Sequence, residues 1–414
     1  MKQQTVQSPE PSYAWVMVGV AGVMQIAGFG ALASITVFLK PLAAEFGWLR
    51  GELAFSYSVA TIGIGLGGIL MGRLSDIFPV RGVVLFGAVV FGSLLFLLSR
   101  IEALWQVYLL FLLIGFLGFS AINVPMLNLL GMWFTRKLGI AIGLATVGSA
   151  LGQGIIPFIA SHLIGLVGWR DTYAFLGLAY LGVMVLLALL VRGPGVQEQG
   201  KAHSGTVASL SSPEFGMSRR NMVALLSFAV IFCCITMATP IIHLVPLASD
   251  SGLPPQAAAG VLAAMMIAGV VGRLIAGRSA DRLGGVQTYA ITAFFQTILV
   301  FWFTKVDTLI GLYAMAIVFG VGYAGVMTSL IYCARFFAPA GKAGLSIGVV
   351  GFFGWLGMGL GGYQAGYFYD FTGNYTQSFM NAALSGVVNL IIISILYHYG
   401  VRKISFGRQN ALAD

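Results

Sequence analysis

Arg273 is the residue best placed to do chemistry, because it lies inside the apolar stretch 257–276. That stretch is long enough to cross a bilayer, which takes roughly 20 apolar residues. A guanidinium stays charged at any accessible pH, and burying one in a membrane is costly, so such residues mark substrate paths. Its fork of N–H donors matches a carboxylate through two parallel hydrogen bonds. We therefore expect Arg273 to bind the carboxylate of a substrate.

The composition indicates a protein that crosses the membrane many times. Of the 414 residues, 58% are hydrophobic and only 8% are charged, and the mean hydropathy is +0.93. A soluble domain carries about 25% charged residues. The sequence therefore predicts an all-α membrane protein with twelve transmembrane helices, at residues 14–38, 53–72, 82–99, 104–130, 138–162, 172–191, 222–247, 257–276, 285–304, 308–333, 343–366 and 377–399.

The positions of the basic residues predict the orientation. With a cytoplasmic N-terminus, sixteen of the 22 Lys and Arg residues fall on the inner side and five on the outer side. By the positive-inside rule both termini are then cytoplasmic, and the net charge of +9 needs no nucleic-acid partner. The first apolar run is too long for a cleavable signal peptide. Cys233, Cys234 and Cys333 lie in spans without metal-binding spacing and are expected to be packing residues.

The chain repeats itself at a fixed spacing, which we call the repeat offset. Gly72-Arg-Leu-Ser-Asp76 follows the second span, and Gly277-Arg-Ser-Ala-Asp281 follows the eighth. The Gly, Arg and Asp of the first motif recur at their own numbers plus 205. Glycine pairs such as Gly168 with Gly373 keep the same offset. We therefore expect two pseudo-symmetric six-helix bundles with a substrate site between them. The predicted parts are a cytoplasmic tail at 1–13, an N-terminal bundle at 14–191, a cytoplasmic linker at 192–220, a C-terminal bundle at 221–400 and a cytoplasmic tail at 401–414.

The repeat tests whether the fold itself requires Arg273. The alternative interpretation is a helix-end arginine that reaches the inner headgroups, because Gly277 opens the next loop four residues later. The position one repeat offset earlier is Gly68, so the duplicated fold does not need an arginine there. The twelve apolar spans also contain no Asp or Glu that could neutralise it. The substrate-binding role is therefore favoured.

Several motifs carry a family resemblance. The loop from Gly72 to Arg81, with its copy after Gly277, resembles the hallmark loop of the major facilitator superfamily, although Pro79 stands where a glycine is usual. The stretch 133–149 is similar to the motif entering the fifth span in the branch of monocarboxylate transporters and oxalate:formate antiporters, as are 168–173 and 243–246. The resemblance covers nearly the whole chain and implies a carrier that works by alternating access.

Two departures from that branch bear on the substrate. Many monocarboxylate carriers have an Asp four residues before the arginine of the eighth span, as a proton site, whereas this chain has Gly269. Oxalate carriers have a Lys in the eleventh span, whereas the stretch 343–366 contains no Lys or Arg. A dianion would lack its second counter-charge, which favours a monoanion.

The resemblance also implies that spans 1, 4, 5, 7, 8, 10 and 11 line the cavity. Tyr, Asn, Ser and Thr side chains there can complete the hydrogen bonds of a carboxylate, and aromatic rings can cover its apolar part. The alternative for each residue is packing or contact with lipid. The candidates besides Arg273 are Phe29, Tyr57, Phe119, Asn123, Thr146, Ser149, Tyr323, Ser329, Phe352, Phe353 and Trp355.

Other residues are candidates for proton coupling and for conformational control. Histidine is the side-chain type that can exchange a proton near neutrality, so His243, beyond Pro240 in the seventh span, is either a proton-coupling or gating group or a hydrogen-bonded structural histidine. His162 is expected to be structural. A carboxylate is favoured at a helix N-terminus by the helix dipole, so the two loop motifs are expected to hold one conformational state through Gly72, Asp76, Arg81, Gly277, Asp281 and Arg282.

These observations predict a secondary active transporter of small organic monocarboxylates, such as lactate or pyruvate, in the cytoplasmic membrane. It is expected to be a proton symporter that works as a monomer without cofactor or metal. An organic-anion exchanger, a carrier of a larger aromatic carboxylate and a receptor without transport are alternatives. Drug efflux is disfavoured because Gln153, not proline, follows Gly152. A membrane enzyme is disfavoured because no span carries a catalytic motif.

Overall fold

The computed structural model describes residues 11–48, 50–194, 216–250, 252–253, 255–306 and 308–399. Most of the predicted linker and nearly all of both tails lie outside these residues. Within them, 11 helices are long and apolar enough to cross a membrane. The longest, α6 (Leu138–Leu190), is interrupted at Gly168 (φ 81°, ψ 169°). At 1.5 Å per residue its length is about 80 Å, more than twice the hydrocarbon core, so it supplies two spans. The prediction of twelve spans is confirmed.

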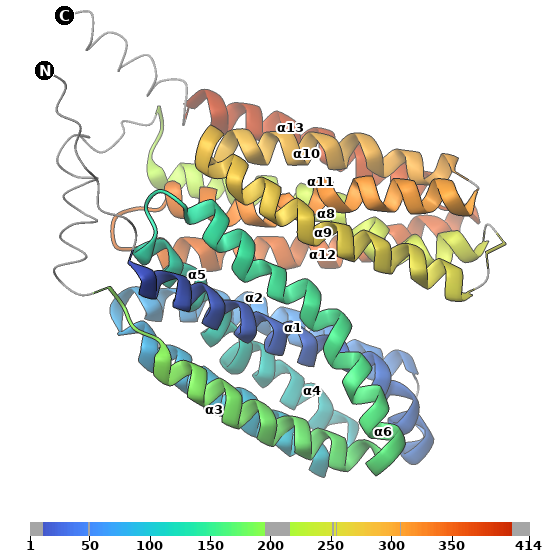
Figure 1. Ribbon diagram of the computed structural model, residues 1–414. Coiled ribbons are helices and arrows are strands. Elements are labelled where there is room, and N and C mark those ends of the chain that lie inside the picture. The colour runs from blue at the N-terminus through green and yellow to red at the C-terminus, as the bar shows by residue number, and fades with distance from the viewer. Residues whose placement is uncertain are drawn as a thin grey trace, which may run out of the picture.

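Each half of the chain forms one helical bundle (Figure 1). In the fourth span a π-helical turn, η2 (Ile114–Phe119), joins α4 to α5. The N-terminal bundle consists of α1 (Ser12–Phe46), α2 (Arg50–Ile77), α3 (Val80–Leu97), the 3₁₀ turn η1 (Leu98–Arg100), α4 (Leu104–Leu113), η2, α5 (Ser120–Trp133) and α6. The C-terminal bundle consists of α8 (Arg219–Asp250), α9 (Pro255–Leu283), α10 (Gly285–Trp302), the 3₁₀ turn η3 (Phe303–Lys305), α11 (Leu309–Phe336), α12 (Ala343–Thr372) and α13 (Thr376–Tyr397).

The repeat offset also relates the observed helices. The helices α10, α11 and α12 begin one repeat offset after α3, α4 and α6, and η3 follows η1 at the same interval. Four of the six glycines with positive φ in the described residues keep it too, since Gly47 pairs with Gly252 and Gly168 with Gly373. A side chain is strained at positive φ, so these glycines mark the same turns in both halves. The two bundles are therefore residue-by-residue counterparts over most of their length.

The bundles meet at one end and separate at the other (Figure 1). We call the end where α1 begins and α13 finishes the terminal end, and the opposite end the open end. Toward the terminal end α2 packs on α12 and α6 packs on α9. Glycines allow this close approach, because a Cβ on Gly72 would collide with the carbonyl of Gly344 and a Cβ on Gly139 with that of Gly277. Small residues let membrane helices touch backbone to backbone.

Candidate functional site

Arg273 lies on the face of α9 that is turned toward α6. Its backbone oxygen would lie 2.8 Å from a Cβ on Gly143, and only 8% of the residue is exposed. The buried Nε has no hydrogen-bond partner, and Arg273 forms no hydrogen bond or ion pair with any described residue. A buried and unpaired guanidinium is destabilising. The bundle interface therefore holds a cation that no described side chain of the protein neutralises.

This position argues against the helix-end alternative. Arg278, five residues further along α9, is exposed, as expected for an arginine at a helix end. Gly277 packs against Gly139 of the other bundle one turn closer to the terminal end. The contact between Gly277 and Gly139 thus lies between Arg273 and the terminal end of the molecule, so Arg273 is not in the headgroup layer at that end.

Tyr323 of α11 is a buried neighbour of Arg273. The residue is 4% exposed and interacts electrostatically with Arg273. Its hydroxyl donates to the sulfur of Met266 at 3.2 Å, and a thioether is a weak acceptor. A Cβ on Gly269 would lie 3.7 Å from the Tyr323 oxygen. The phenol therefore stands beside Gly269, and its proton is available to a stronger acceptor.

Asn123 is held by a residue that the sequence analysis did not single out. Gln25 of α1, which is 5% exposed, donates from Nε2 to Oδ1 of Asn123 at 2.9 Å. Thr328 was also missed, although it is the repeat counterpart of Asn123 and its buried hydroxyl has no partner. Gln25 could have been identified as a polar residue inside the first apolar span, and Thr328 as the residue one repeat offset after Asn123.

Aromatic residues from both bundles meet at the interface. The Phe29 ring of α1 is 5.0 Å from that of Phe119 in an edge-to-face contact, and 6.4 Å from that of Trp355 of α12 in a stacked one. Phe352 lies against α2, where a Cβ on Gly65 would be 3.0 Å from its ring. Phe353 packs instead on the core of the C-terminal bundle. Phe29, Trp355 and Phe352 therefore make contacts between the bundles, Phe119 packs behind Phe29, and Phe353 packs within the C-terminal bundle.

None of the remaining predicted pocket residues, all within the described part of the chain, forms a hydrogen bond with Arg273. The hydroxyls of Thr146, Ser149 and Ser329 donate to backbone carbonyls of their own helices, three or four residues earlier. Tyr57 is 42% exposed on α2. Their roles in binding stay predictions.

His243 lies within the C-terminal bundle toward the open end. Its Nε2 is 3.0 Å from the carbonyl oxygen of Gly362 and its Nδ1 is 3.3 Å from the hydroxyl of Tyr375. The neutral ring can donate at Nε2 and accept at Nδ1, so both contacts are compatible with an uncharged imidazole. His243 thus joins α8 to α12 and to the start of the last span. His162 is exposed and lies against the ring of Phe158.

Two aspartates close the terminal end. Asp76 of α2 accepts from the backbone N–H groups of Gly344 and Leu345 at 2.8 and 2.9 Å, at the start of α12. Asp281 of α9 accepts from those of Gly139 and Ile140 at 2.6 and 3.0 Å, at the start of α6. Each carboxylate therefore satisfies free N–H groups and faces the positive end of a helix in the other bundle.

Arginine contributes to this closure from an unexpected position. Arg81 and Arg282 are exposed, and neither bonds any residue that the structure describes. Instead Arg335 of α11 donates to the backbone oxygen and to Oδ1 of Asn128 at 3.1 and 2.9 Å, and Asn128 donates to Asp76 at 3.3 Å. The predicted role of the aspartates fits this geometry, whereas the expected contacts of Arg81 and Arg282 are not formed.

Over residues 20–362 the chain matches the model of the Major Facilitator Superfamily. The protein belongs to this superfamily. It is a multi-pass membrane transporter and not an enzyme. Among the described residues no group of three or more His, Cys, Asp or Glu side chains could hold a metal ion.

The relatives are distant in sequence, but the matches cover most of both chains. The chain is 26% identical to monocarboxylate transporter 13 of Bos taurus, over 95% of this chain and 91% of the relative. It is 25% identical to human monocarboxylate transporter 2, over 90% and 83%, and 25% identical to the uncharacterized transporter YcxA of Bacillus subtilis, over 92% and 95%.

Solved structures share the fold. The transporter FucP in its outward conformation matches with a TM-score of 0.73 at 14% identity, over 93% of this chain and 99% of FucP. The proton:xylose symporter XylE matches with a TM-score of 0.67 at 16% identity, over 93% and 96%.

Proposed function

We propose that this transporter carries small organic monocarboxylates across the cytoplasmic membrane, with Arg273 binding the carboxylate. The observation that carries the proposal is the buried guanidinium that has no partner among the described residues and lies where the two bundles meet. A carboxylate supplies the missing acceptors in a bidentate geometry. The names of the two monocarboxylate transporters, which match at 26% and 25% identity, support the same class of substrate.

The rest of the substrate is proposed to face the aromatic residues of the interface. One cation without a second in the eleventh span suits one negative charge. Tyr323 can donate a further hydrogen bond to the carboxylate, and the rings of Phe29, Phe119 and Trp355 can cover an apolar part. These rings also support the alternative of a larger aromatic carboxylate. A panel of lactate, pyruvate, phenylpyruvate and oxalate distinguishes the classes.

We further propose that the terminal end lies in the cytoplasm, which the distribution of Lys and Arg supports. The structure is then an outward-facing state, because the bundles are in contact at that end and diverge at the other (Figure 1). Transport requires the contacts of Asp76 and Asp281 to break and the open end to close.

Two forms of coupling are candidates. In proton symport, His243 is the coupling group, because protonating it would change the contact between α8 and α12. In anion exchange, the empty carrier does not reorient. Arg273 favours this second form. Without bound substrate, its unpaired charge would be enclosed between the bundles each time the carrier changes from one open state to the other.

The binding role is tested by uptake into proteoliposomes. Arg273→Lys keeps the charge but loses the planar fork, so we expect uptake of lactate or pyruvate to fall at least tenfold. Arg278→Lys is the matched control, because Arg278 is exposed on the same helix and should tolerate the change. Wild-type uptake by the Arg273→Lys variant would contradict the proposal.

The coupling is tested with the same vesicles. A proton gradient imposed on vesicles without internal substrate drives uptake by a symporter and not by an exchanger. Counterflow that requires internal monocarboxylate identifies the exchanger.

A further inference from the structure

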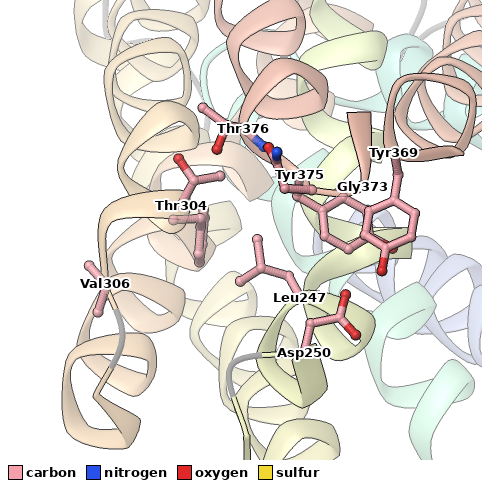
Figure 2. Close-up of a pocket in the computed structure, with 10 residues that line it drawn as sticks. Leu247, Asp250, Thr304, Val306, Tyr369, Gly373, Tyr375 and Thr376 are labelled. Atoms are coloured by element: carbon pink, nitrogen blue, oxygen red, sulfur yellow. The ribbon is translucent and has the colours of Figure 1, made fainter. Parts of the chain in front are cut away.

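A hollow of about 290 Å³ lies at the open end of the C-terminal bundle, apart from the interface that holds Arg273. It is open on one side and is lined by the ends of α8, α12 and η3 and by the start of α13 (Figure 2). The Asp250 carboxylate lies at its edge beside the ring of Tyr369, which stacks on that of Tyr375 at 4.4 Å between ring centres. None of its lining residues is basic; they are Leu247, Asp250, Phe303, Thr304, Val306, Tyr369, Gly373, Asn374, Tyr375 and Thr376.

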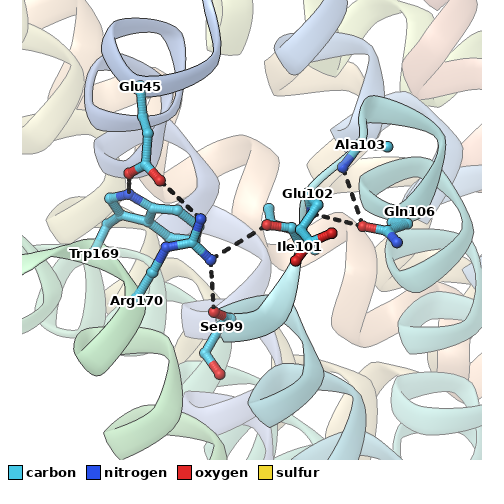
Figure 3. Close-up of polar contacts among 8 residues, drawn as sticks. All are labelled: Glu45, Ser99, Ile101, Glu102, Ala103, Gln106, Trp169 and Arg170. Atoms are coloured by element: carbon cyan, nitrogen blue, oxygen red, sulfur yellow. Dashed lines mark hydrogen bonds and ion pairs between the residues drawn. The ribbon is translucent and has the colours of Figure 1, made fainter.

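The repeat identifies the counterpart of this hollow in the N-terminal bundle. Moving back by the repeat offset converts Asp250 to Glu45 and Tyr375 to Arg170. Thr304 becomes Ser99, Val306 becomes Ile101 and Asn374 becomes Trp169. These five counterparts are the residues of a polar cluster at the open end of the N-terminal bundle (Figure 3).

In that cluster the guanidinium of Arg170 is surrounded by acceptors. Its Nη2 donates to Glu45 Oε1 at 2.7 Å, which is an ion pair. Its Nη1 donates to the backbone oxygens of Ser99 and Ile101 at 3.2 and 3.3 Å. The ring of Trp169 lies 4.4 Å from the guanidinium carbon and donates from its N–H to Glu45. The N-terminal hollow is thus filled by a cation that the chain itself supplies.

The C-terminal bundle keeps the acceptors and lacks the cation. Asp250 has no ion-pair partner among the described residues. Tyr375, at the position of Arg170, contacts His243 through its hydroxyl and is not charged. Asp370 adds a second negative charge near Tyr369. Carboxylates and tyrosine faces together attract organic cations.

We propose that this hollow binds a guanidinium or ammonium cation from outside the chain, in the place that Arg170 fills in the other bundle. The Asp250 carboxylate pairs with the cation, and the tyrosine rings cover its apolar part. The cation is either free in solution or the ammonium of a phosphatidylethanolamine headgroup, since both present the same chemistry at this end of the helices.

The test is the thermal stability of the full-length protein in phosphatidylcholine nanodiscs, titrated with methylguanidinium chloride against sodium chloride at equal ionic strength. Because a ligand of the folded state raises Tm by mass action, we expect a saturable rise with methylguanidinium only. Asp250→Asn should weaken the apparent affinity about tenfold or more, because it removes the charged acceptor. Asp370→Asn, which leaves Asp250 in place, should weaken it much less.

Two further variants use the repeat itself. Tyr375→Arg supplies the guanidinium from the chain, so its Tm should exceed that of the wild type and should not respond to methylguanidinium. Arg170→Ala empties the N-terminal hollow, so its lowered Tm should be partly restored by methylguanidinium. Phosphatidylethanolamine in the nanodisc should abolish the wild-type response if the headgroup is the occupant, and leave it intact if the cation is free.

The proposal is overturned if the wild type responds no more to methylguanidinium than to sodium chloride. It is also overturned if Asp250→Asn responds with the affinity of the wild type. A response of Arg170→Ala without one in the wild type would show that the assay detects such a site and that the C-terminal hollow is not one.

Discussion

Replacing Asp281 by Asn should shift the protein toward opening at the terminal end. The carboxylate accepts two backbone N–H groups at the start of α6, at 2.6 and 3.0 Å. Hydrogen bonds to a charged group contribute about 1.5–3 kcal/mol each when buried, and the helix dipole adds about 0.3–1 kcal/mol. Asp281 is only half-buried and Asn keeps one acceptor, so solvent screening reduces the loss. We expect a net loss of about 1–2 kcal/mol.

That loss changes the ratio of closed to open terminal ends by about five- to thirtyfold. Spin labels on cysteines introduced at Arg73 and Arg278, both exposed near the terminal end, measure the separation of α2 and α9 by pulsed electron resonance. Cys233, Cys234 and Cys333 are buried and are replaced by Ala in the background. Asp281→Asn should add a population with a longer distance.

Asp76→Asn should act in the same direction through α12, because its carboxylate makes the corresponding pair of bonds. Asp171→Asn is the matched control, since Asp171 is exposed at the open end. An unchanged distance distribution in both the Asp76 and the Asp281 variants would refute the view that these carboxylates hold the terminal end closed.

Three other outcomes are expected. Hydrogen bonds from Trp169, and then from Arg170, hold the pKa of Glu45 below its usual value. The contribution of Glu45 to stability is therefore present above the ordinary Glu pKa and is lost as pH falls through the lowered pKa. The Tm difference between the wild type and Glu45→Gln should shrink as pH falls from 7 toward 3. Gly139→Ala places a Cβ against the carbonyl of Gly277 and should lengthen the label distance between α2 and α9, whereas Gly154→Ala, with open space around its Cβ, should not. His243→Ala should flatten the pH dependence of uptake, and an unchanged profile would remove His243 as the coupling group.

The sequence predicts much of this fold because both of its signals, span length and the repeat offset, can be read along the chain without knowing which helices touch. The length of each apolar stretch locates the spans. It also predicts two spans within α6, separated near Gly168, which the repeat offset pairs with Gly373. The repeat offset then predicts the bundles, since it also separates the first residues of corresponding helices. Arg273 could be identified for the same reason, because a single charged residue in an apolar stretch is visible in the sequence without any information on contacts.

The contacts between helices were harder to predict. The bonds from Gln25 to Asn123 and from Arg335 to Asn128 depend on how two helices are rotated against each other, and span lengths carry no information on rotation. The π-helical turn before Ser120 adds to this, because it changes which face the second half of the fourth span presents. The roles of Thr146, Ser149 and Ser329 could not be read from residue type alone, because a hydroxyl in a helix can face a pocket or bond its own backbone.

The turn at Gly168 leaves the fifth and sixth spans joined by a single non-helical residue. A connection that short cannot absorb relative motion, so a change in the tilt of one span is transmitted directly to the other. The fifth and sixth spans are therefore expected to tilt together. Inserting residues at Gly168 should let the two spans move independently without unfolding either helix.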